Sequence, residues 1–391
     1  MRPTMRRIAS FSGPAAVAAA VALLGSGPNA DSDSSRFVGA GRMLLSSHWS
    51  LAFASKYIQA GPLQLALFGS LGRSETALDV TLALATTLLL LAAADAVGVR
   101  SSALAVAVGL LGVVIGLTRV GYVWGHPADA MLPLVWILAA VAARRERVVL
   151  AGVLVGLSAG LETWGILGVA ALALASRWRD VGRGMLVSSA VGACLFAPFV
   201  LGGHFEMLQY AWPVRHPSFL SLFLANGAHF GWPLRLLQSM AAVGCGIAAA
   251  RLLRQSPHAP WVAPLAVVAV RLVLDPLLLP YYRTAVDGPV LVGAALLASR
   301  LAAFRGMVSV GEEASTSGRG ARSPFHTHQP RPFLATYVLT GGVTYVLSVL
   351  NQLSGLKKGT DRGPIRPSGG LRPRAKSGIR GRQPPHRGQA K

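Results

Sequence analysis

Long apolar blocks, separated by short charged clusters, recur along most of this chain. One block runs from Thr76 to Val99 and another from Met185 to Leu201. A helix needs about 20 apolar residues to cross a hydrocarbon core roughly 30 Å thick, so such blocks predict membrane-spanning helices. A composition of 52% hydrophobic and only 13% charged residues excludes a soluble globular fold. We expect an all-α fold, a polytopic transmembrane helical bundle of about 10–11 spans.

The basic residues predict how the bundle is oriented. The chain carries a net charge of +22, and its tail from Lys357 onward contributes +10, because eleven Lys or Arg face the single Asp361. Most other cations occupy short turns such as Arg144-Arg145-Glu146-Arg147. Since loops rich in Lys and Arg stay in the cytoplasm, we expect a multi-pass protein of the inner, or plasma, membrane. Membrane lipids then surround it, and no nucleic-acid partner is expected.

The N-terminal segment allows two interpretations. Three arginines precede an apolar stretch from Ala15 to Gly25, which is the pattern of either a cleavable signal peptide or a short first span. We favour the uncleaved span. Both interpretations place residues 28–60 outside the cytoplasm, and Pro62 to Leu71 is too short to cross and is expected at the interface.

The remaining blocks divide the chain into a membrane domain and a polar C-terminal part. We expect residues 1–304 to form the transmembrane domain, with outer turns at Arg119 to Asp129 and at Glu162. Residues 305–332, rich in Ser, Gly, Arg and His, predict a cytoplasmic linker. Residues 333–353 are apolar enough for an extra transmembrane or interfacial helix, although crossing would place the basic tail outside. Residues 354–391 have almost nothing to bury and predict a disordered basic tail.

One glycine-rich motif has a catalytic and a structural interpretation. The sequence Gly156-Leu157-Ser158-Ala159-Gly160 matches the nucleophile elbow of serine hydrolases, which requires a strand, a sharp turn and a helix. Here the motif lies in an apolar helix. Together with Gly152 it forms a ridge of small residues at every fourth position, which lets two membrane helices approach closely. We favour packing over catalysis.

Ionisable residues close to the predicted outer face are the candidates for function, because charge at membrane depth is costly. A carboxylate there can take a proton from a sugar hydroxyl, while nearby Arg and His hold a phosphate leaving group. A solvated loop residue is the competing interpretation for each of them, and an internal ion pair is the alternative for Arg271 and Asp275. No metal site and no cofactor is expected. The candidates are Asp31 and Asp33 for catalysis, and Arg36, His126, Asp129, Glu162, Arg215, His216, Asp275, Tyr281, Tyr282 and Arg283 for substrate binding.

The order of several short motifs resembles glycosyltransferase family 87, which comprises polyprenyl-phosphate-mannose-dependent mannosyltransferase-like members of the GT-C superfamily. The likeness spans about Asp31 to Phe304. It is carried by Gly125-His126-Pro127-Ala128-Asp129, by Leu150 to Leu157 with Trp164, by Trp212-Pro213-Val214 to Ser218, by Trp232-Pro233, and by Leu274-Asp275-Pro276 with Pro280-Tyr281-Tyr282.

The resemblance implies a GT-C fold, a polyprenyl-phosphate sugar donor and catalysis on the extracytoplasmic face. It also implies an acidic base in the first outer loop, which is Asp31 or Asp33 here. The chain departs from the family in two places: Glu162 stands where a Lys is common, and Ser32 or Ser34 follows the acid in place of a bulky residue.

The expected function is transfer of a hexose, such as mannose, from a polyprenyl-phosphate donor to a cell-envelope glycan or lipid acceptor. A transporter or flippase is the alternative, and it fits less well because the polar residues gather at one face and not at the midplane. A third interpretation is a non-catalytic membrane scaffold whose basic tail binds anionic lipid or nucleic acid.

Overall fold

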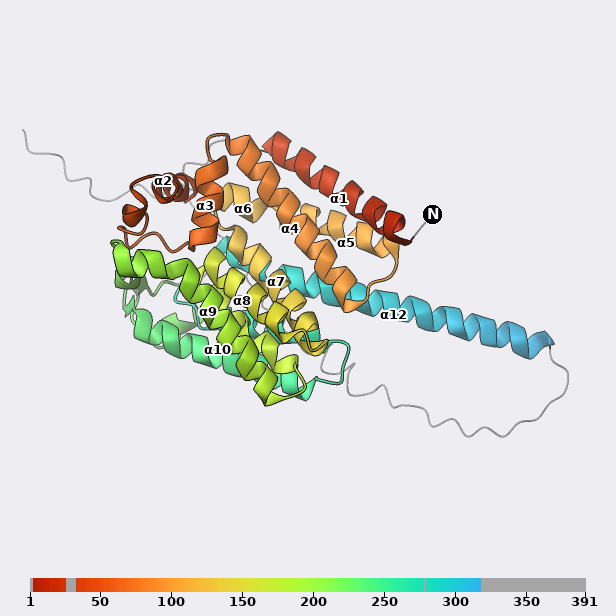
Figure 1. The fold of residues 1–391 in the computed structure, drawn as a ribbon. Coiled ribbons are helices and arrows are strands. Elements are labelled where there is room, and N and C mark those ends of the chain that lie inside the picture. Colours follow the sequence, from red (N-terminus) through yellow and green to blue (C-terminus); the bar gives the residue numbers. More distant parts are fainter. Residues whose placement is uncertain (1–2, 26–32, 278, 318–391) are drawn as a thin grey trace, which may run out of the picture. The chain divides into compact units, whose positions relative to one another are not determined.

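The computed structural model describes residues 3–25, 33–277 and 279–317. Asp31, the segment 333–353 and the tail 354–391 lie outside these residues, as does most of the predicted linker. Within them the all-α prediction is confirmed (Figure 1). The α-helices are α1 (Pro3–Gly25), α2 (Ser34–Leu44), α3 (Pro62–Leu71), α4 (Glu75–Val97), α5 (Ser102–Val114), α6 (Arg119–Trp124), α7 (Pro127–Arg144), α8 (Val148–Leu161), α9 (Trp178–Gly202), α10 (Trp232–Leu252), α11 (Ala259–Val273) and α12 (Thr284–Ser317).

Shorter elements connect these helices. One of them, η2, is a 3-10 helix of 12 residues, where the apolar stretch from Trp164 to Ser176 predicts the second arm of a helical hairpin. The loop between α9 and α10 also holds the one β-ribbon among the described residues, in which Trp212 pairs with Phe230. The connecting elements are η1 (Trp49–Leu51), η2 (Thr163–Leu174), η3 (Met207–Gln209), β1 (Trp212–Pro213), η4 (Phe219–Leu222), β2 (His229–Phe230) and η5 (Pro280–Arg283).

Six helical segments in the described part of the chain are long and apolar enough to cross a membrane. They are Glu75–Val97, Ser102–Gly121, Pro127–Arg144, Trp178–Gly202, Trp232–Leu252 and Tyr281–Phe304. Shorter apolar helices accompany them, among them most of α1, α3, α8, η2 and α11. The chain is therefore a membrane protein built as a helical bundle, while the count of 10–11 spans stays a prediction.

Helix α7 is the central element of the bundle. It packs against α4, α6, α8, η2, α11 and α12. Of its residues only Leu138 and Arg144 are not buried. A helix that is apolar all round is stable only when neighbours or lipid cover every face, and here the neighbours are protein. Its two ends therefore mark the two ends of the bundle core.

The predicted glycine ridge packs helix α8 against α9, as expected. A Cβ atom built on Gly156 would lie 2.5 Å from Cβ of Val191, and one on Gly152 would lie 2.5 Å from the carbonyl oxygen of Gly184. Ser158 within the motif is fully buried, and its Oγ accepts from Trp136 Nε1 at 3.1 Å and lies 2.8 Å from the carbonyl oxygen of Gly165. The motif is a packing surface, not a nucleophile elbow.

The basic turns meet at one end of the bundle. Arg144 Nη1 donates to the carbonyl oxygen of Ser256 at 2.7 Å, and Arg145 Nη2 donates to that of Ala96 at 3.3 Å. Arg251 Nη1 donates to the carbonyl oxygen of Ala175 at 3.3 Å, beside the turn that follows η2. These bonds join turns that are far apart in sequence. The end that they form, the basic end, has the one-sided charge that the positive-inside pattern predicts.

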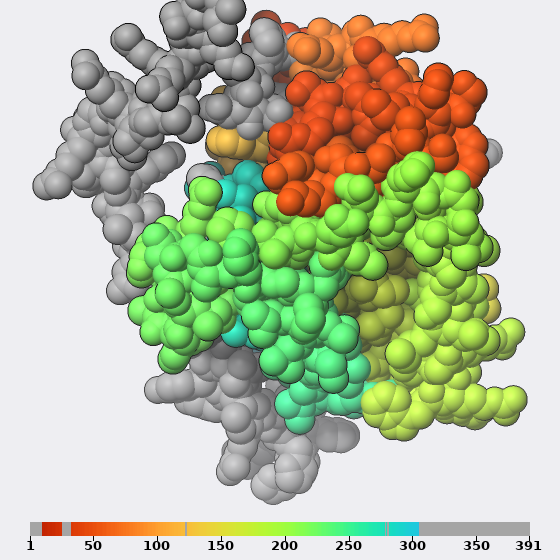
Figure 2. Space-filling view, turned by 90° about the vertical axis from the view of Figure 1, so that its left-hand side faces the viewer, coloured from red at the N-terminus to blue at the C-terminus, as the bar shows by residue number. Residues whose placement is uncertain are grey.

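The opposite end is built from the described part of the predicted outer segment 28–60, the predicted interfacial segment Pro62 to Leu71 and the loop after α9. Figure 2 looks onto it, with the α2–α3 region beside the loop that follows α9. The amide of His204 donates to the carbonyl oxygen of Ser50 at 2.8 Å, and Gln59 Nε2 donates to that of Met207 at 3.2 Å. Helices α2 and α6 were not predicted; α2 packs on α3 so closely that a Cβ on Gly41 would collide with the backbone of Leu65.

Several predicted boundaries were wrong, and two of these errors concern candidate residues. Asp129 lies in the first turn of α7 and not in a loop, because Pro127 provides the fixed backbone angle that begins a helix. Helix α11 ends at Val273, so Asp275 lies beyond it and not inside a span. Helix α12 continues to Ser317, past the predicted start of the linker at residue 305.

We predict that Gly156→Leu destabilises the protein by about 1–3 kcal/mol, because the added side chain overpacks the α8–α9 contact. Gly244→Leu is the matched control, since a Cβ there meets nothing within 4 Å. Thermal denaturation of the detergent-solubilised chain measures the difference. Equal melting temperatures for the two variants contradict the close packing of α8 on α9.

Candidate active site

The end of the bundle opposite the basic end brings together polar side chains from five segments. Two backbone contacts align these segments. The turn between α8 and η2 pairs with the start of α3, where Gly61 N donates to the carbonyl oxygen of Leu161 at 2.8 Å. The loop after α9 joins the segment after α11, where Arg215 N donates to the carbonyl oxygen of Pro276 at 3.0 Å. These two bonds join residues 100 and 61 positions apart in the chain.

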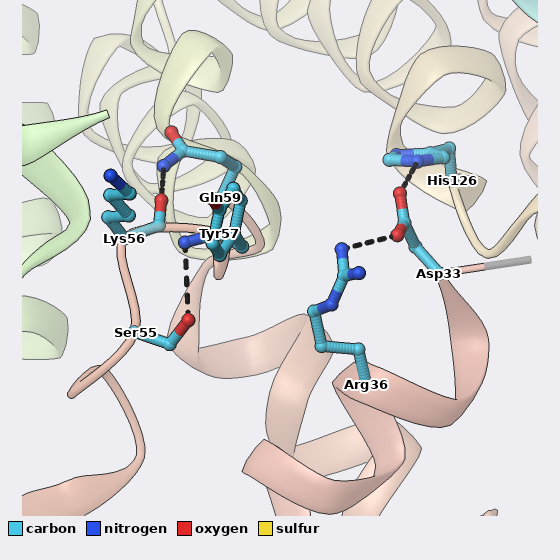
Figure 3. Close-up of polar contacts among 7 residues, drawn as sticks. All are labelled: Asp33, Arg36, Ser55, Lys56, Tyr57, Gln59 and His126. Atoms are coloured by element: carbon cyan, nitrogen blue, oxygen red, sulfur yellow. Dashed lines mark hydrogen bonds and ion pairs between the residues drawn. The ribbon is translucent and has the colours of Figure 1, made fainter. Parts of the chain in front are cut away.

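Asp33 is the first described residue of the outer loop and directly precedes helix α2. Its carboxylate accepts from Arg36 Nη1 at 2.7 Å and lies 3.2 Å from Nε2 of His126 (Figure 3). About 37% of the side chain is exposed, so a ligand can still reach the carboxylate. Of the two predicted bases, Asp33 therefore has a defined setting, and Asp31 lies outside the described residues.

His126 is held in place from three sides. Its ring stacks on Tyr281 with centroids 4.7 Å apart and an interplanar angle of 9°, and it meets the edge of Phe37 at 5.7 Å. The preceding Gly125 has φ of 78°, and a Cβ there would lie 2.8 Å from the backbone nitrogen of Ser34. Glycine is thus needed both for the left-handed turn and for the approach of the residue that follows Asp33.

The electrostatics of the pair favour its charged form. Burial alone lowers the pKa of His126, but the hydrogen bond to Asp33 and the negative charges of Asp129 and Glu162 outweigh it and raise the pKa above the usual 6.5. The hydrogen bond to His126 lowers the pKa of Asp33 below its usual 3.8, although partial burial opposes this. Each shift favours the charged form of the pair, an ionised Asp33 beside a protonated His126.

Asp129, Glu162, Trp164 and Arg271 form a second group, called here the Arg271 cluster. The guanidinium of Arg271 lies 4.0 Å from the ring centroid of Trp164, and Arg271 is only 7% exposed. Asp129 is only 2% exposed and interacts electrostatically with Glu162 and Arg271. The cluster draws on α7, the α8–η2 turn, η2 and the last turn of α11.

A buried ion pair lies beside this cluster. Arg235 Nη1 donates to Asp275 Oδ2 at 2.9 Å and to Gln238 Oε1 at 2.9 Å. Gln238 Nε2 in turn donates to the carbonyl oxygen of Arg271 at 2.7 Å, and the Arg235 guanidinium lies 4.1 Å from the ring centroid of Trp212. Asp275 therefore pairs with α10, and the predicted alternative of an ion pair between Asp275 and Arg271 is not the direct contact seen here.

The structure separates the sequence candidates into two groups. Arg215, His216 and Arg283 are exposed and lie outside both polar groups; His216 Nδ1 lies 2.9 Å from Ser221 Oγ in the loop after α9. The other described candidates come together at this end. They are Asp33, Arg36, His126, Asp129, Glu162, Asp275, Tyr281 and Tyr282.

Arg235 was missed by the sequence analysis. Arg271 was weighed there only together with Asp275, and Trp164 only as part of the family resemblance. Arg235 has a signal that could have found it, because it follows Trp232-Pro233 and lies inside an apolar helix, where a cation is costly unless it is paired. Trp164 lacks such a signal, since its contact with Arg271 joins residues far apart in sequence.

The arrangement can carry out proton transfer and bind polar groups. An ionised, accessible carboxylate next to a guanidinium and an imidazole can accept a proton from a bound hydroxyl. Among the described residues no group of three or more His, Cys, Asp or Glu is placed to hold a metal ion.

Comparisons with known proteins identify no relative. No protein-family model matches the chain, and neither curated proteins nor solved structures give a match. The function therefore has to be argued from the site.

We predict that His126→Gln removes a pH-dependent contribution to stability. The His126 pKa is raised in the folded protein, so its contribution is fully present below the usual 6.5 and is lost as pH rises through the raised value. The Asp33 pKa is lowered, so its contribution is present above 3.8 and is lost as pH falls through the lowered value. The melting temperature of the wild type should exceed that of the variant most between pH 3.8 and pH 6.5. A difference that grows above pH 7 contradicts the ion pair.

We predict that Asp275→Asn costs about 3–5 kcal/mol of stability, because Arg235 is left buried without its carboxylate. The double variant Arg235→Met, Asp275→Asn should lose less, because it removes both charges. Chemical denaturation of the three proteins measures this. A double variant that is less stable than Asp275→Asn contradicts the pairing.

Proposed function

We propose that this chain is an integral-membrane glycosyltransferase that moves a hexose, such as mannose, from a polyprenyl-phosphate donor to an envelope glycan or lipid. The observation that carries the proposal is the accessible Asp33 carboxylate, fixed by Arg36 and His126 at the end opposite the basic turns. By the positive-inside rule that end faces away from the cytoplasm, where a lipid-linked donor is the available source of activated sugar.

Asp33 has the properties of a general base. It accepts the proton of an acceptor hydroxyl, whose oxygen attacks the anomeric carbon of the donor sugar. The bond from that carbon to the phosphate oxygen breaks, and the lipid phosphate leaves with the electron pair. The cations beside Asp33 keep it ionised at neutral pH and hold it in one position, which a base must occupy to be within reach of the hydroxyl.

Arg36, which is paired with Asp33, and Lys56, near the same Tyr57 ring as Arg36, can stabilise the charge that develops on the departing phosphate. Arg36 and Lys56 both approach the ring of Tyr57, at 5.7 and 5.5 Å from its centroid, and both are exposed (Figure 3). Donors already oriented toward a developing negative charge need little reorganisation during the reaction, and this is often the largest catalytic contribution. A polyprenyl chain attached to that phosphate would run along the apolar, lipid-facing helices.

A transporter or flippase is the second candidate, and the burial of Asp129 and Arg271 favours it. Ionisable side chains buried between spans are typical of proteins that bind a substrate or proton during transport. The glycosyltransferase is preferred because these residues join Asp33 at one end of the bundle.

The test is transfer of labelled sugar from polyprenyl-phosphate mannose to endogenous envelope lipids in membranes that contain the chain. We expect Asp33→Asn to reduce transfer by about 100-fold or more at equal protein level, because the base is lost. Asp31→Ala is measured alongside to separate the two acids of the outer loop. Asp79→Asn is the control, since it makes the same acid-to-amide change on α4, outside the site.

Three outcomes count against the proposal in different ways. Full transfer by Asp33→Asn means that Asp33 is not the base, and loss of transfer only in Asp31→Ala moves the base to Asp31. Absence of transfer above empty membranes, together with labelled donor moving across the bilayer, favours the transporter.

A further inference from the structure

The Arg271 cluster has four buried polar atoms that hydrogen-bond to none of the described residues. They are Asp129 Oδ1, Glu162 Oε2, Trp164 Nε1 and Arg271 Nη1. A buried polar group without a partner costs free energy, so native proteins rarely leave several together unless something else satisfies them. This set is therefore the strongest indication of a binding site in the described part of the chain.

To satisfy all four atoms, a ligand must both donate and accept hydrogen bonds. Carboxylate oxygens accept only, whereas an indole N–H and a guanidinium N–H donate only. A hydroxyl group does both, so neighbouring hydroxyls on one ring can donate to Asp129 and Glu162 and accept from Arg271 and Trp164. The backbone contacts of Glu162 support this use, because its own amide and carbonyl are already bonded to Ser158 and Gly165 and only the side chain is left to bind.

The charge of the cluster argues against a phosphate. The cluster has two carboxyl groups for its one guanidinium, and the neighbouring Arg235 is already paired with Asp275. Placing a phosphate beside two buried carboxylates adds like charges in a region of low dielectric constant, where repulsion is strong. An uncharged polyol avoids this repulsion and still satisfies all four atoms.

We infer that the Arg271 cluster binds the hydroxyl groups of a sugar ring, and that the phosphate of the donor lies elsewhere, beside Arg36 and Lys56. This inference rests on the proposed function and assigns the sugar and the phosphate of the donor to separate groups of residues. Glu162 and Asp129 select a hydroxyl-rich ring, and Arg271, held against Trp164, fixes its orientation.

Binding of free sugars tests the inference without any transfer reaction. Saturation-transfer NMR detects weak ligands, so the full chain in detergent is mixed with methyl glycosides of mannose, glucose, galactose and arabinose in turn, and separately with inorganic phosphate. We expect at least one glycoside to bind the wild type and the Asp79→Asn control equally. Glu162→Gln and Asp129→Asn should each weaken that binding about 10-fold or more, because a hydrogen bond to a charged group is lost.

Charge reversal gives a second, opposite readout. Glu162→Lys replaces one of the two carboxyl groups of the cluster with a cation, so we expect it to lose glycoside binding and gain binding of phosphate, followed by broadening of the phosphorus signal. The melting temperature of each variant is compared with that of Asp79→Asn. If a substitution at position 162 unfolds the chain, glycoside binding by Asp129→Asn alone tests the inference.

The outcomes separate this inference from the proposed function. Glycoside binding that depends on Glu162 or Asp129, in a protein that transfers no sugar, supports the inference and removes the glycosyltransferase. If the wild type transfers sugar, but Glu162→Gln and Asp129→Asn both bind glycosides as tightly as the wild type does, the inference is overturned and the proposed function stands. No binding of any of the four glycosides, or phosphate binding by the wild type that Glu162→Gln strengthens, also overturns it.

Discussion

The enclosure of helix α7 is the constraint on which the rest of the structure depends. Six elements contact it, so along almost its whole length it can carry only apolar side chains. Charged residues are confined to its two ends, with Asp129 in the first turn and Arg144 in the last. Arg144 binds the backbone of the turn before α11, whereas Asp129 lies among the polar groups of the candidate site. The chemistry of the two ends thus follows from one apolar helix between them.

The sequence predicted the membrane bundle and its charge asymmetry because both depend on composition along the chain. Apolar length and basic turns are local properties, so α4, α9 and the basic end needed no knowledge of tertiary contacts. The errors arose where a few residues at a helix end decide the outcome. Pro127 moved Asp129 from a loop into a helix, and the end of α11 at Val273 moved Asp275 out of one.

The sequence predicted many of the residues of the candidate site but few of the contacts between them. Asp33 and His126 were named because acids and imidazoles are unusual at the edge of a membrane, but their contact joins residues 93 positions apart. The partner of Asp275 is Arg235, 40 positions earlier in the chain, and not the nearer Arg271. Such pairs depend on which helices pack together, and apolar helix surfaces of similar composition leave that choice open in the sequence.

The 3-10 conformation of η2 changes how far a short segment reaches. At a rise of about 2.0 Å per residue its 12 residues extend about 24 Å, whereas the 14 residues of α8 extend about 21 Å at about 1.5 Å each. The helices α8 and η2 therefore have nearly equal lengths although they contain different numbers of residues. With three residues per turn, side chains also align in straight columns: Thr163, Ile166 and Val169 are half-buried, while Gly165, Gly168 and Ala171 are buried. A single-residue deletion in this arm would rotate every later side chain by one column, so half-buried positions would exchange places with buried ones.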